Sequence, residues 1–252
     1  MLSYQVKDID KMRICIVLPC YNEEKRFNSP VLINFVKRND IHFCLVNDGS
    51  TDNTINILNN VKDESNAKVE IISLNSNVGK AEAIRTAFLK ILSKEKYDFI
   101  GYFDADLATP LEEIFNLMQP FKAKDYYFTF GSRIKIVGKE IYRKAYRHYL
   151  GRAFATAARL ILGIPVYDTQ CGAKIFNVRM IDGIFNERFV SKWFFDIEIF
   201  KRYIRKYTLE NIMKSILEVP LNNWEHKEGS KLKFWDYLKV PIELLRIKIY
   251  YS

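Results

Sequence analysis

The sequence contains no run of about 18 apolar residues, so it predicts no helix that crosses a membrane. The segment from Met1 to Arg13 is too polar for the hydrophobic core of a signal peptide. Histidine is scarce, and the scattered positions of His42, His148 and His226 argue against a zinc site built from histidines. No internal repeat or low-complexity segment is apparent. These absences favour an ordinary globular protein.

Cysteine is sparse as well. The four cysteines show no C-x-x-C spacing and stand in apolar or mixed stretches, at Cys15, Cys20, Cys44 and Cys171. This distribution argues against a disulfide framework or a zinc finger. We therefore expect reduced thiols and a cytoplasmic protein.

Acidic residues are outnumbered, with 30 Asp and Glu against 39 Lys and Arg, and the formal net charge is +9. Such an excess calls for an anionic partner, which can be nucleic acid, a phosphorylated substrate or an anionic membrane. A nucleic-acid-binding module is the weakest of these, because the chain lacks both an RNP-type aromatic strand and zinc-finger spacing. With 252 residues, 48% of them hydrophobic, the chain can form one large domain with or without an appendage.

Apolar segments of strand length alternate with amphipathic segments of helical period along the first half of the chain. We expect strands at 13–18, 42–46, 69–74, 97–103 and 126–130. After the second of these, Ser50 or Thr51 can cap the next helix. Strands that alternate with helices imply right-handed crossovers, so the sequence predicts an α/β fold with a mostly parallel sheet.

One stretch stands out: the apolar run that begins at Tyr97 ends abruptly at Asp104 and Asp106. Two carboxylates so close repel each other unless a cation lies beside them, and hard oxygen ligands suit Mg²⁺ or Mn²⁺. Such a metal shares its remaining positions with water and substrate phosphates. The alternative is a pair of solvated loop acids, or acids before the helix that Thr109 and Pro110 open.

Polar residues follow the other predicted strands too, at Glu23, Asp48, Lys80 and Arg133. The carboxyl ends of parallel strands meet at one edge of a sheet, where open α/β proteins bind ligands. We therefore expect these side chains to line one crevice, although loops are polar in any protein.

Two segments of the second half are basic and amphipathic. Residues 142–162 repeat aromatic and aliphatic residues at helical spacing between arginines and lysines, and residues 233–252 alternate aromatics and aliphatics with basic residues around Pro241. Such helices lie on membrane surfaces or in anionic grooves, or they pack on a core with a solvated basic face. We expect the second segment to lie in a membrane interface, the alternative being a docked helix.

Eight motifs together resemble the inverting glycosyltransferases of family 2, which have the GT-A fold, and most closely the dolichyl- and polyprenyl-phosphate glucosyl- and mannosyltransferases. They span nearly the whole chain in the family's order: IVLPCYNEEKR (16–26), LVNDGSTDNT (45–54), NVGKAEAIRTAF (77–88), DADLATP (104–110), GSR (131–133), DTQCGAKIF (168–176), WFFDIE (193–198) and EVPLNNWEHKEGSK (218–231). The resemblance implies a Rossmann-like, mostly parallel sheet flanked by helices over residues 1–232, with residues 233–252 as a C-terminal interfacial segment.

The resemblance also assigns roles to residues. It implies that Pro19, Tyr21 and Glu23 flank the nucleotide, and that Asp48 binds its base, unless Asp48 caps the following helix. Lys80 matches a position of the donor site near the nucleotide. The alternative is that Lys80 is an exposed lysine in the first turn of a helix.

For the reacting groups, the resemblance implies Asp104 near the ribose and metal, and Asp106 as the direct metal ligand. Arg133 matches an arginine cluster for the acceptor phosphate and donor diphosphate, to which Arg147 and Arg152 also belong. Asp196 matches the acid on the acceptor side, and we expect it to orient the nucleophile or take up residual protons, the alternative being a helix N-terminal acid favoured by the macrodipole. It stands two residues from Glu198 on one helix, so only one of the two can face a cleft.

The activity implied is metal-dependent, inverting transfer of glucose or mannose from UDP-glucose or GDP-mannose to a polyprenyl phosphate. We expect a peripheral enzyme on the cytoplasmic face of an anionic membrane, with no nucleic acid as partner. Family 2 also contains enzymes that act on soluble or cell-surface glycans, so a different acceptor is the main alternative.

Overall fold

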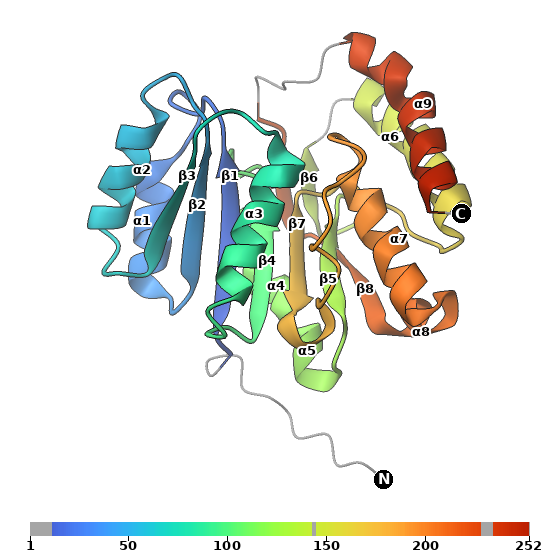
Figure 1. Ribbon diagram of the computed structural model, residues 1–252, viewed down its shortest axis with the longest axis horizontal. Helices are drawn as coiled ribbons and strands as arrows, with labels where there is room; N and C mark the ends of the chain where they lie inside the picture. The colour runs from blue at the N-terminus through green and yellow to red at the C-terminus, as the bar shows by residue number, and fades with distance from the viewer. Residues whose placement is uncertain (1–11, 143–144, 228–233, 252) are drawn as a thin grey trace.

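A computed structural model describes residues 12–142, 145–227 and 234–251 of the chain. It contains a seven-stranded sheet with the order β3-β2-β1-β4-β7-β5-β8 and a two-stranded sheet, β6-β9 (Figure 1). The strands are β1 (Ile14–Cys20), β2 (His42–Asp48), β3 (Val69–Leu74), β4 (Phe99–Phe103), β5 (Phe128–Ser132), β6 (Glu140–Tyr142), β7 (Ala173–Asn177), β8 (Ile216–Pro220) and β9 (Asn223–Glu225). In the large sheet only β7 is antiparallel to its neighbours β4 and β5. The mostly parallel α/β sheet expected from the sequence is confirmed.

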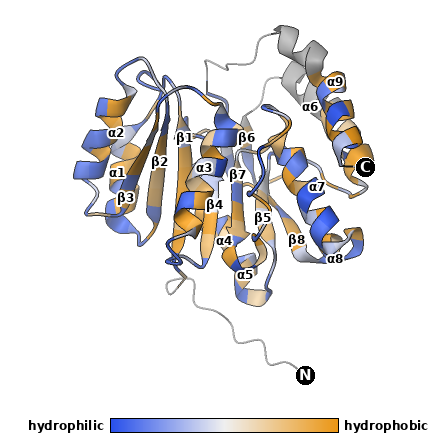
Figure 2. Ribbon diagram, in the orientation of Figure 1, coloured by the Kyte–Doolittle hydropathy of each residue, from blue (hydrophilic) through white to orange (hydrophobic). Residues whose placement is uncertain are grey.

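Helices cover both faces of this sheet. They are α1 (Ser29–Arg38), α2 (Thr54–Asp63), α3 (Lys80–Leu92), α4 (Glu113–Met118), α5 (Pro120–Ala123), α6 (Ala145–Leu162), α7 (Phe195–Tyr207), α8 (Leu209–Ser215) and α9 (Phe234–Tyr250), with a short 3₁₀ turn at Val178–Met180. One hydrophobic cluster joins a face of the sheet to α1, α2, α4 and α5, and a second joins the opposite face to α3, α7 and α9. The strands are mostly hydrophobic, whereas the helices carry hydrophilic residues on their outer sides (Figure 2).

The central strands are easy to recognise in the sequence because they are fully buried. Every residue of β4, β5 and β7 is buried, because helices cover both faces of these strands. Such strands appear in the sequence as continuous apolar runs, so they are recognisable without tertiary information. The parallel strands turn their carboxyl ends to one edge of the sheet, and the reversed strand β7 begins at that same edge.

The cap expected for the second helix is wrong. Helix α2 begins at Thr54 with Asn53 as its N-cap residue, and not directly after Ser50 or Thr51. The hydroxyl of Ser50 instead accepts a hydrogen bond from the backbone N–H of Asn22, and the N–H of Thr51 donates to the Asn22 side chain. The 50–53 segment therefore ties the ends of β1 and β2 together before the helix starts.

The C-terminal helix α9 packs against the domain along one side. Its Leu244 and Ile247 are buried in the cluster shared with α3 and α7, a burial that stabilises by about 1.5–3 kcal/mol per side chain. Its other side exposes Ile242, Leu245 and Ile249. The helix is thus docked, as in the alternative considered from the sequence, and a membrane role for its outer side stays a prediction. Among the described residues, no helix combines the length and apolarity needed to span a bilayer.

Candidate active site

Two carboxylates stand at the carboxyl end of the buried strand β4. The backbone N–H of Asp104 donates to the carbonyl of Gly172 at 3.0 Å, which joins the strand end to the entry of β7. The chain then turns sharply, with Leu107 at a φ of 50° and its N–H bonded to the Asp104 carbonyl. In this turn the Asp106 carboxylate accepts a hydrogen bond from the Ala108 N–H at 3.1 Å. The turn therefore fixes both acids at the edge where the sequence predicts a ligand.

Cations from two other strand ends face this acid pair. The Lys80 ammonium lies 2.5 Å from Asp104 Oδ1, and both side chains remain more than a third exposed. Burial would lower the pKa of Lys80, but the charge of Asp104, helped by Asp196 and Asp106, outweighs burial and raises it. Burial raises the pKa of Asp106, and the neighbouring charge of Asp104 raises it further. The ionised form of Asp106 is therefore disfavoured unless a cation lies close to it.

Arg26 is a second cation near the acids and was not assigned a role from the sequence. Its guanidinium is bound to the Glu23 carboxylate at 2.6 and 2.9 Å. The hydrogen bond with Glu23 is the main reason that the pKa of Arg26 is raised, and the charges of Asp106 and Asp104 add to it. Glu23, predicted beside the nucleotide, is buried and orients this arginine. Pro19 and Tyr21 lie at the end of β1 next to it and are half-buried.

Asp48 holds the loop that leads into α3. Its carboxylate accepts the N–H groups of Val78 at 2.8 Å and Gly79 at 2.9 Å, and the side-chain amide of Asn77 at 3.1 Å. These contacts run from the end of β2 to the residues just before Lys80. The alternative of a helix cap for Asp48 is excluded, since α2 has Asn53 in that position.

Gly172 is required by its distance from Asp104. A Cβ atom at this position would lie 2.0 Å from Asp104 Oδ2, far inside van der Waals contact. The loop 168–172, which is the DTQCG part of DTQCGAKIF, therefore packs its backbone directly against one of the two acids.

Arg133 is held in a fixed orientation at the end of β5. Its Nε and Nη2 atoms donate to the two oxygens of Asp168 at 2.7 and 2.8 Å, and its backbone N–H donates to Asp168 as well. Burial would lower the pKa of Arg133, but Asp168 outweighs burial and raises it. Glu218, whose own pKa burial raises, accepts the N–H groups of Tyr167 and Asp168 and so fixes the partner. The other two arginines of the predicted cluster, at 147 and 152, lie on α6 with side chains outside the described residues.

Asp196 lies inside the protein instead of facing open solvent. It is 4% exposed and accepts a hydrogen bond from the Lys174 ammonium at 2.5 Å and another from the Tyr102 hydroxyl. Glu198 is buried too and accepts the N–H groups of Val190 and Ser191. Both carboxylates of this helix are therefore buried and bound by neighbouring groups; that only one of them can face a cleft stays a prediction.

Lys174 is a site residue that was not selected from the sequence. It is fully buried, and its ammonium also donates to the carbonyls of Thr169 at 2.8 Å and Cys171 at 2.9 Å. These bonds shape the loop that contacts both Asp104 and Arg133. Within the described residues, Thr169 Oγ1 and Gln170 Nε2 of this loop are buried without a hydrogen-bond partner. The signal available in the sequence was a lysine inside an otherwise apolar strand, AKIFN.

The comparisons with known proteins agree with the geometry. A family model described as glycosyl transferase family 2 matches residues 15–185. A dolichyl-phosphate beta-glucosyltransferase of Saccharomyces cerevisiae is 31% identical over 97% of this chain and 77% of that protein. The mouse protein of the same name is 29% identical, with the same coverage. Among solved structures, glucosyl-3-phosphoglycerate synthase from Mycobacterium tuberculosis with Mn²⁺, UDP and glucosyl-3-phosphoglycerate has a TM-score of 0.66 at 16% identity, covering 96% of this chain and 80% of that one.

Proposed function

Because the chain belongs to glycosyl transferase family 2, we propose that it transfers glucose from UDP-glucose to the phosphate of a polyprenyl lipid, with inversion at the anomeric carbon. The observation that carries the proposal is the acid pair Asp104 and Asp106 at the carboxyl edge of the sheet, with Lys80 and Arg26 beside it. Glucose is favoured over mannose because the relatives described above bear the name dolichyl-phosphate beta-glucosyltransferase.

A divalent metal fits this site. Asp104 and Asp106 are hard oxygen donors, and burial, together with the charge of Asp104, raises the pKa of Asp106, so a cation bound by these acids would be stabilised. Within the described part of the chain, no group of three or more candidate ligands could hold a metal without help. A metal that keeps substrate phosphates and waters as its other ligands, as Mg²⁺ does, matches this donor set. When bound, it would act as a Lewis acid and neutralise charge on the leaving diphosphate.

The side chains of the site would bind and orient the substrate phosphates. Lys80 and Arg26 place positive charge where the diphosphate gains negative charge, which is the electrostatic stabilisation that speeds such a step. Asp48 positions the loop before Lys80, and Arg133, fixed by Asp168, offers a rigid guanidinium toward phosphate. The Nε2 atom of Gln170, two residues before Gly172, is buried without a hydrogen-bond partner among the described residues, and we assign it to a hydroxyl group of the sugar.

Asp196 does not need to act as a base. The acceptor phosphate has a second pKa of about 6 and is already mostly dianionic at neutral pH. Since Asp196 is bound by Lys174 and Tyr102, we assign it to positioning: it holds Lys174, which in turn holds the loop 168–172. This assignment changes the catalytic role expected for Asp196 from the sequence into a supporting one.

Membrane contact is part of the proposal. The exposed Ile242, Leu245 and Ile249 of α9, near the basic helix α6, form an amphipathic surface of the kind that lies on anionic lipid. Sedimentation with vesicles of phosphatidylglycerol should retain the protein, and vesicles of phosphatidylcholine alone should not. A location on the cytoplasmic face stays a prediction.

The test is transfer itself. Purified protein with Mn²⁺, labelled UDP-glucose and a polyprenyl phosphate should produce label that extracts into organic solvent, and GDP-mannose should not replace the donor. Asp106→Asn should abolish the product, whereas the matched change Asp63→Asn on the exposed end of α2 should not. Label that appears only in water-soluble products would favour the alternative of a soluble acceptor. No transfer from either donor would refute the proposal.

A further inference from the structure

A short segment, residues 221–225, connects two parts of the candidate site, and we call it the strap. It follows β8 directly and includes β9, which pairs with β6 in the small sheet. At its start the N–H of Leu221 donates to the carbonyl of Ser132, the last residue of β5, at 3.0 Å. At its end the N–H of Glu225 donates to the carbonyl of Ala108 at 3.1 Å. The strap therefore bonds to the end of β5 and to the turn that follows the acid pair.

The contact at Ala108 reaches the acid pair itself. The N–H of Ala108 donates to Asp106 Oδ1 at 3.1 Å, and the carbonyl of the same residue accepts the hydrogen bond from the strap. A displacement of the strap would therefore move the residue whose backbone orients the Asp106 carboxylate.

The strap is fastened to the domain by a buried acid, Glu113 on α4. This residue is 2% exposed, and its Oε1 atom accepts the N–H groups of Asn222 at 2.8 Å and Asn223 at 3.0 Å. Its Oε2 atom accepts the side-chain amide of Asn116, which also donates to the carbonyl of Pro220 at 3.1 Å. Hydrogen bonds to an ionised carboxylate are stronger than those between neutral groups. The strap is thus held in one conformation before any ligand arrives, which lowers the entropy cost of binding.

Trp224 lies within the strap, and its indole ring packs against Arg133. The Cζ atom of Arg133 is 5.5 Å from the ring centre, and Trp224 is only 8% exposed. A guanidinium over an indole face is attracted by the ring, more strongly where both groups are shielded from water. Asp168 binds the Nε and Nη2 atoms of the same guanidinium, which leaves Nη1 without a hydrogen bond among the described residues. Trp224 therefore fixes the plane of the guanidinium, and Asp168 fixes its edge.

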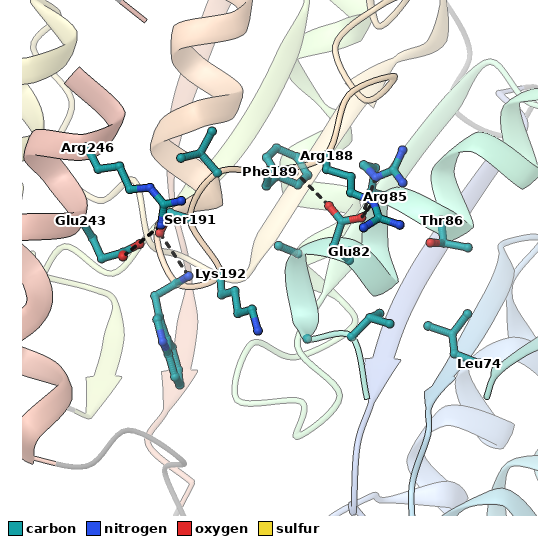
Figure 3. Close-up of a pocket in the computed structure, with 15 residues that line it drawn as sticks. Leu74, Glu82, Arg85, Thr86, Arg188, Phe189, Ser191, Lys192, Glu243 and Arg246 are labelled. Carbon is teal, nitrogen blue, oxygen red and sulfur yellow. Dashed lines mark hydrogen bonds and ion pairs between the residues drawn. The ribbon is translucent and has the colours of Figure 1, made fainter. Parts of the chain in front are cut away.

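A second tryptophan provides a contrast. Trp193 is 44% exposed and lines a pocket of about 660 Å³ between α3, the loop 188–193 and α9 (Figure 3). In that pocket the Arg85 guanidinium is bound to Glu82 at 2.9 Å. Trp193 thus offers the same side chain away from the strap, and it supplies a matched control.

We propose that Trp224 is a positioning residue of the site. Through the strap, it holds the Arg133 guanidinium so that Nη1 meets the phosphate oxygens of a diphosphate bound beside Asp106. The inference rests on the proposed function for the identity of the reaction, but its binding test needs neither sugar nor lipid.

A double-mutant cycle, measured by calorimetric titration with Mn²⁺ and inorganic pyrophosphate, tests whether Trp224 acts through Arg133. Trp224→Leu should weaken pyrophosphate binding at least fivefold. Arg133→Lys, which keeps a cation beside Asp168 but loses the planar fork, should also weaken it at least fivefold. The double variant should bind no more than twofold more weakly than Arg133→Lys alone, because no guanidinium is left to position.

Two further variants separate the role of the ring from a general loss of packing. Trp224→Phe keeps an aromatic face and should bind pyrophosphate within threefold of the native chain, whereas Trp193→Leu should bind it as the native chain does. Thermal unfolding checks that each variant is folded, and Trp224→Met repeats the cycle if the leucine variant is not.

Several outcomes would overturn the inference. They are losses that multiply in the double variant, native binding by Trp224→Leu or Arg133→Lys, binding by Trp224→Phe as weak as that of Trp224→Leu, or an equal loss in Trp193→Leu. If the cycle shows coupling but no sugar reaches a lipid phosphate, the role of Trp224 stands and the proposed function fails. If sugar is transferred but the cycle shows no coupling, the proposed function stands and this inference fails.

Discussion

Two lysine–aspartate pairs of the same length lie near the edge of the sheet, yet their surroundings differ. In each pair the nitrogen and oxygen are 2.5 Å apart. The side chains of Lys80 and Asp104 are 37% and 39% exposed, whereas those of Lys174 and Asp196 are 0% and 6% exposed. A pair in contact with water can be opened by a competing ligand at little cost, and a buried pair cannot. The first pair is therefore suited to exchange partners during a reaction, and the second to hold structure.

The largest expected effect comes from breaking the buried pair. Lys174→Met should lower the free energy of unfolding by about 3–5 kcal/mol, because it leaves the Asp196 charge buried without its cation. Urea denaturation measures this. The control Lys206→Met breaks the exposed pair with Asp182 and should cost no more than about 1 kcal/mol. Similar losses in the two variants would mean that burial does not distinguish these pairs.

Breaking the exposed pair of Lys80 and Asp104 should have a small effect on stability and a large effect on activity. Lys80→Met should change the free energy of unfolding by less than about 1 kcal/mol, because solvent screens the lost attraction. It should lower kcat for sugar transfer about 100-fold, equivalent to about 2.7 kcal/mol, because charge near the diphosphate is lost. Steady-state kinetics beside urea denaturation separates the two quantities. A large loss of stability with normal kcat would reverse our interpretation of the pair.

A third change is at Gly172, where the loop 168–172 packs against Asp104. Gly172→Ala should cost about 1–3 kcal/mol of stability, since the new methyl group overlaps Asp104. It should also weaken Mn²⁺ binding, because Asp104 must move. Isothermal titration with Mn²⁺ measures the second effect. An alanine variant with native metal affinity would show that the position of Asp104 is not set by this contact.

The smallest effect, and the one with a pH signature, involves the end of α9. Burial raises the pKa of Glu198, and the Tyr251 hydroxyl opposes that rise by bonding its carboxylate. Tyr251→Phe should therefore raise the pKa further and cost about 1 kcal/mol where Glu198 is ionised. The cost should be complete above the raised pKa and shrink as pH falls through it, because the neutral acid needs the bond less. Thermal unfolding of both proteins from pH 4 to 8 measures it, and a cost independent of pH contradicts it.

The sequence predicted what depends on local pattern. Strand β4 and the two acids at its end follow from a continuous apolar run that stops at polar residues. The reversed direction of β7 was not predictable, because AKIFN is compatible with either direction until its neighbours are known. The hydrogen-bond partners of Lys174 and Arg202 were not predictable either, because they come from other segments of the chain. Lys174 and Asp196 are 22 positions apart in the sequence. A buried lysine needs an acidic partner, so its burial cannot be predicted until that partner has been located.

The reversed strand β7 has a consequence for variation within such proteins. Ser132 ends β5 and Ala173 begins β7, and both lie at the edge that carries the acid pair, so residues 133–172 leave the sheet and return to it at one rim. A stretch with both ends anchored side by side can be lengthened, shortened or exchanged without shifting the register of any strand. Exchange of this stretch between members of the family should therefore leave the strand order and the registers of the large sheet unchanged.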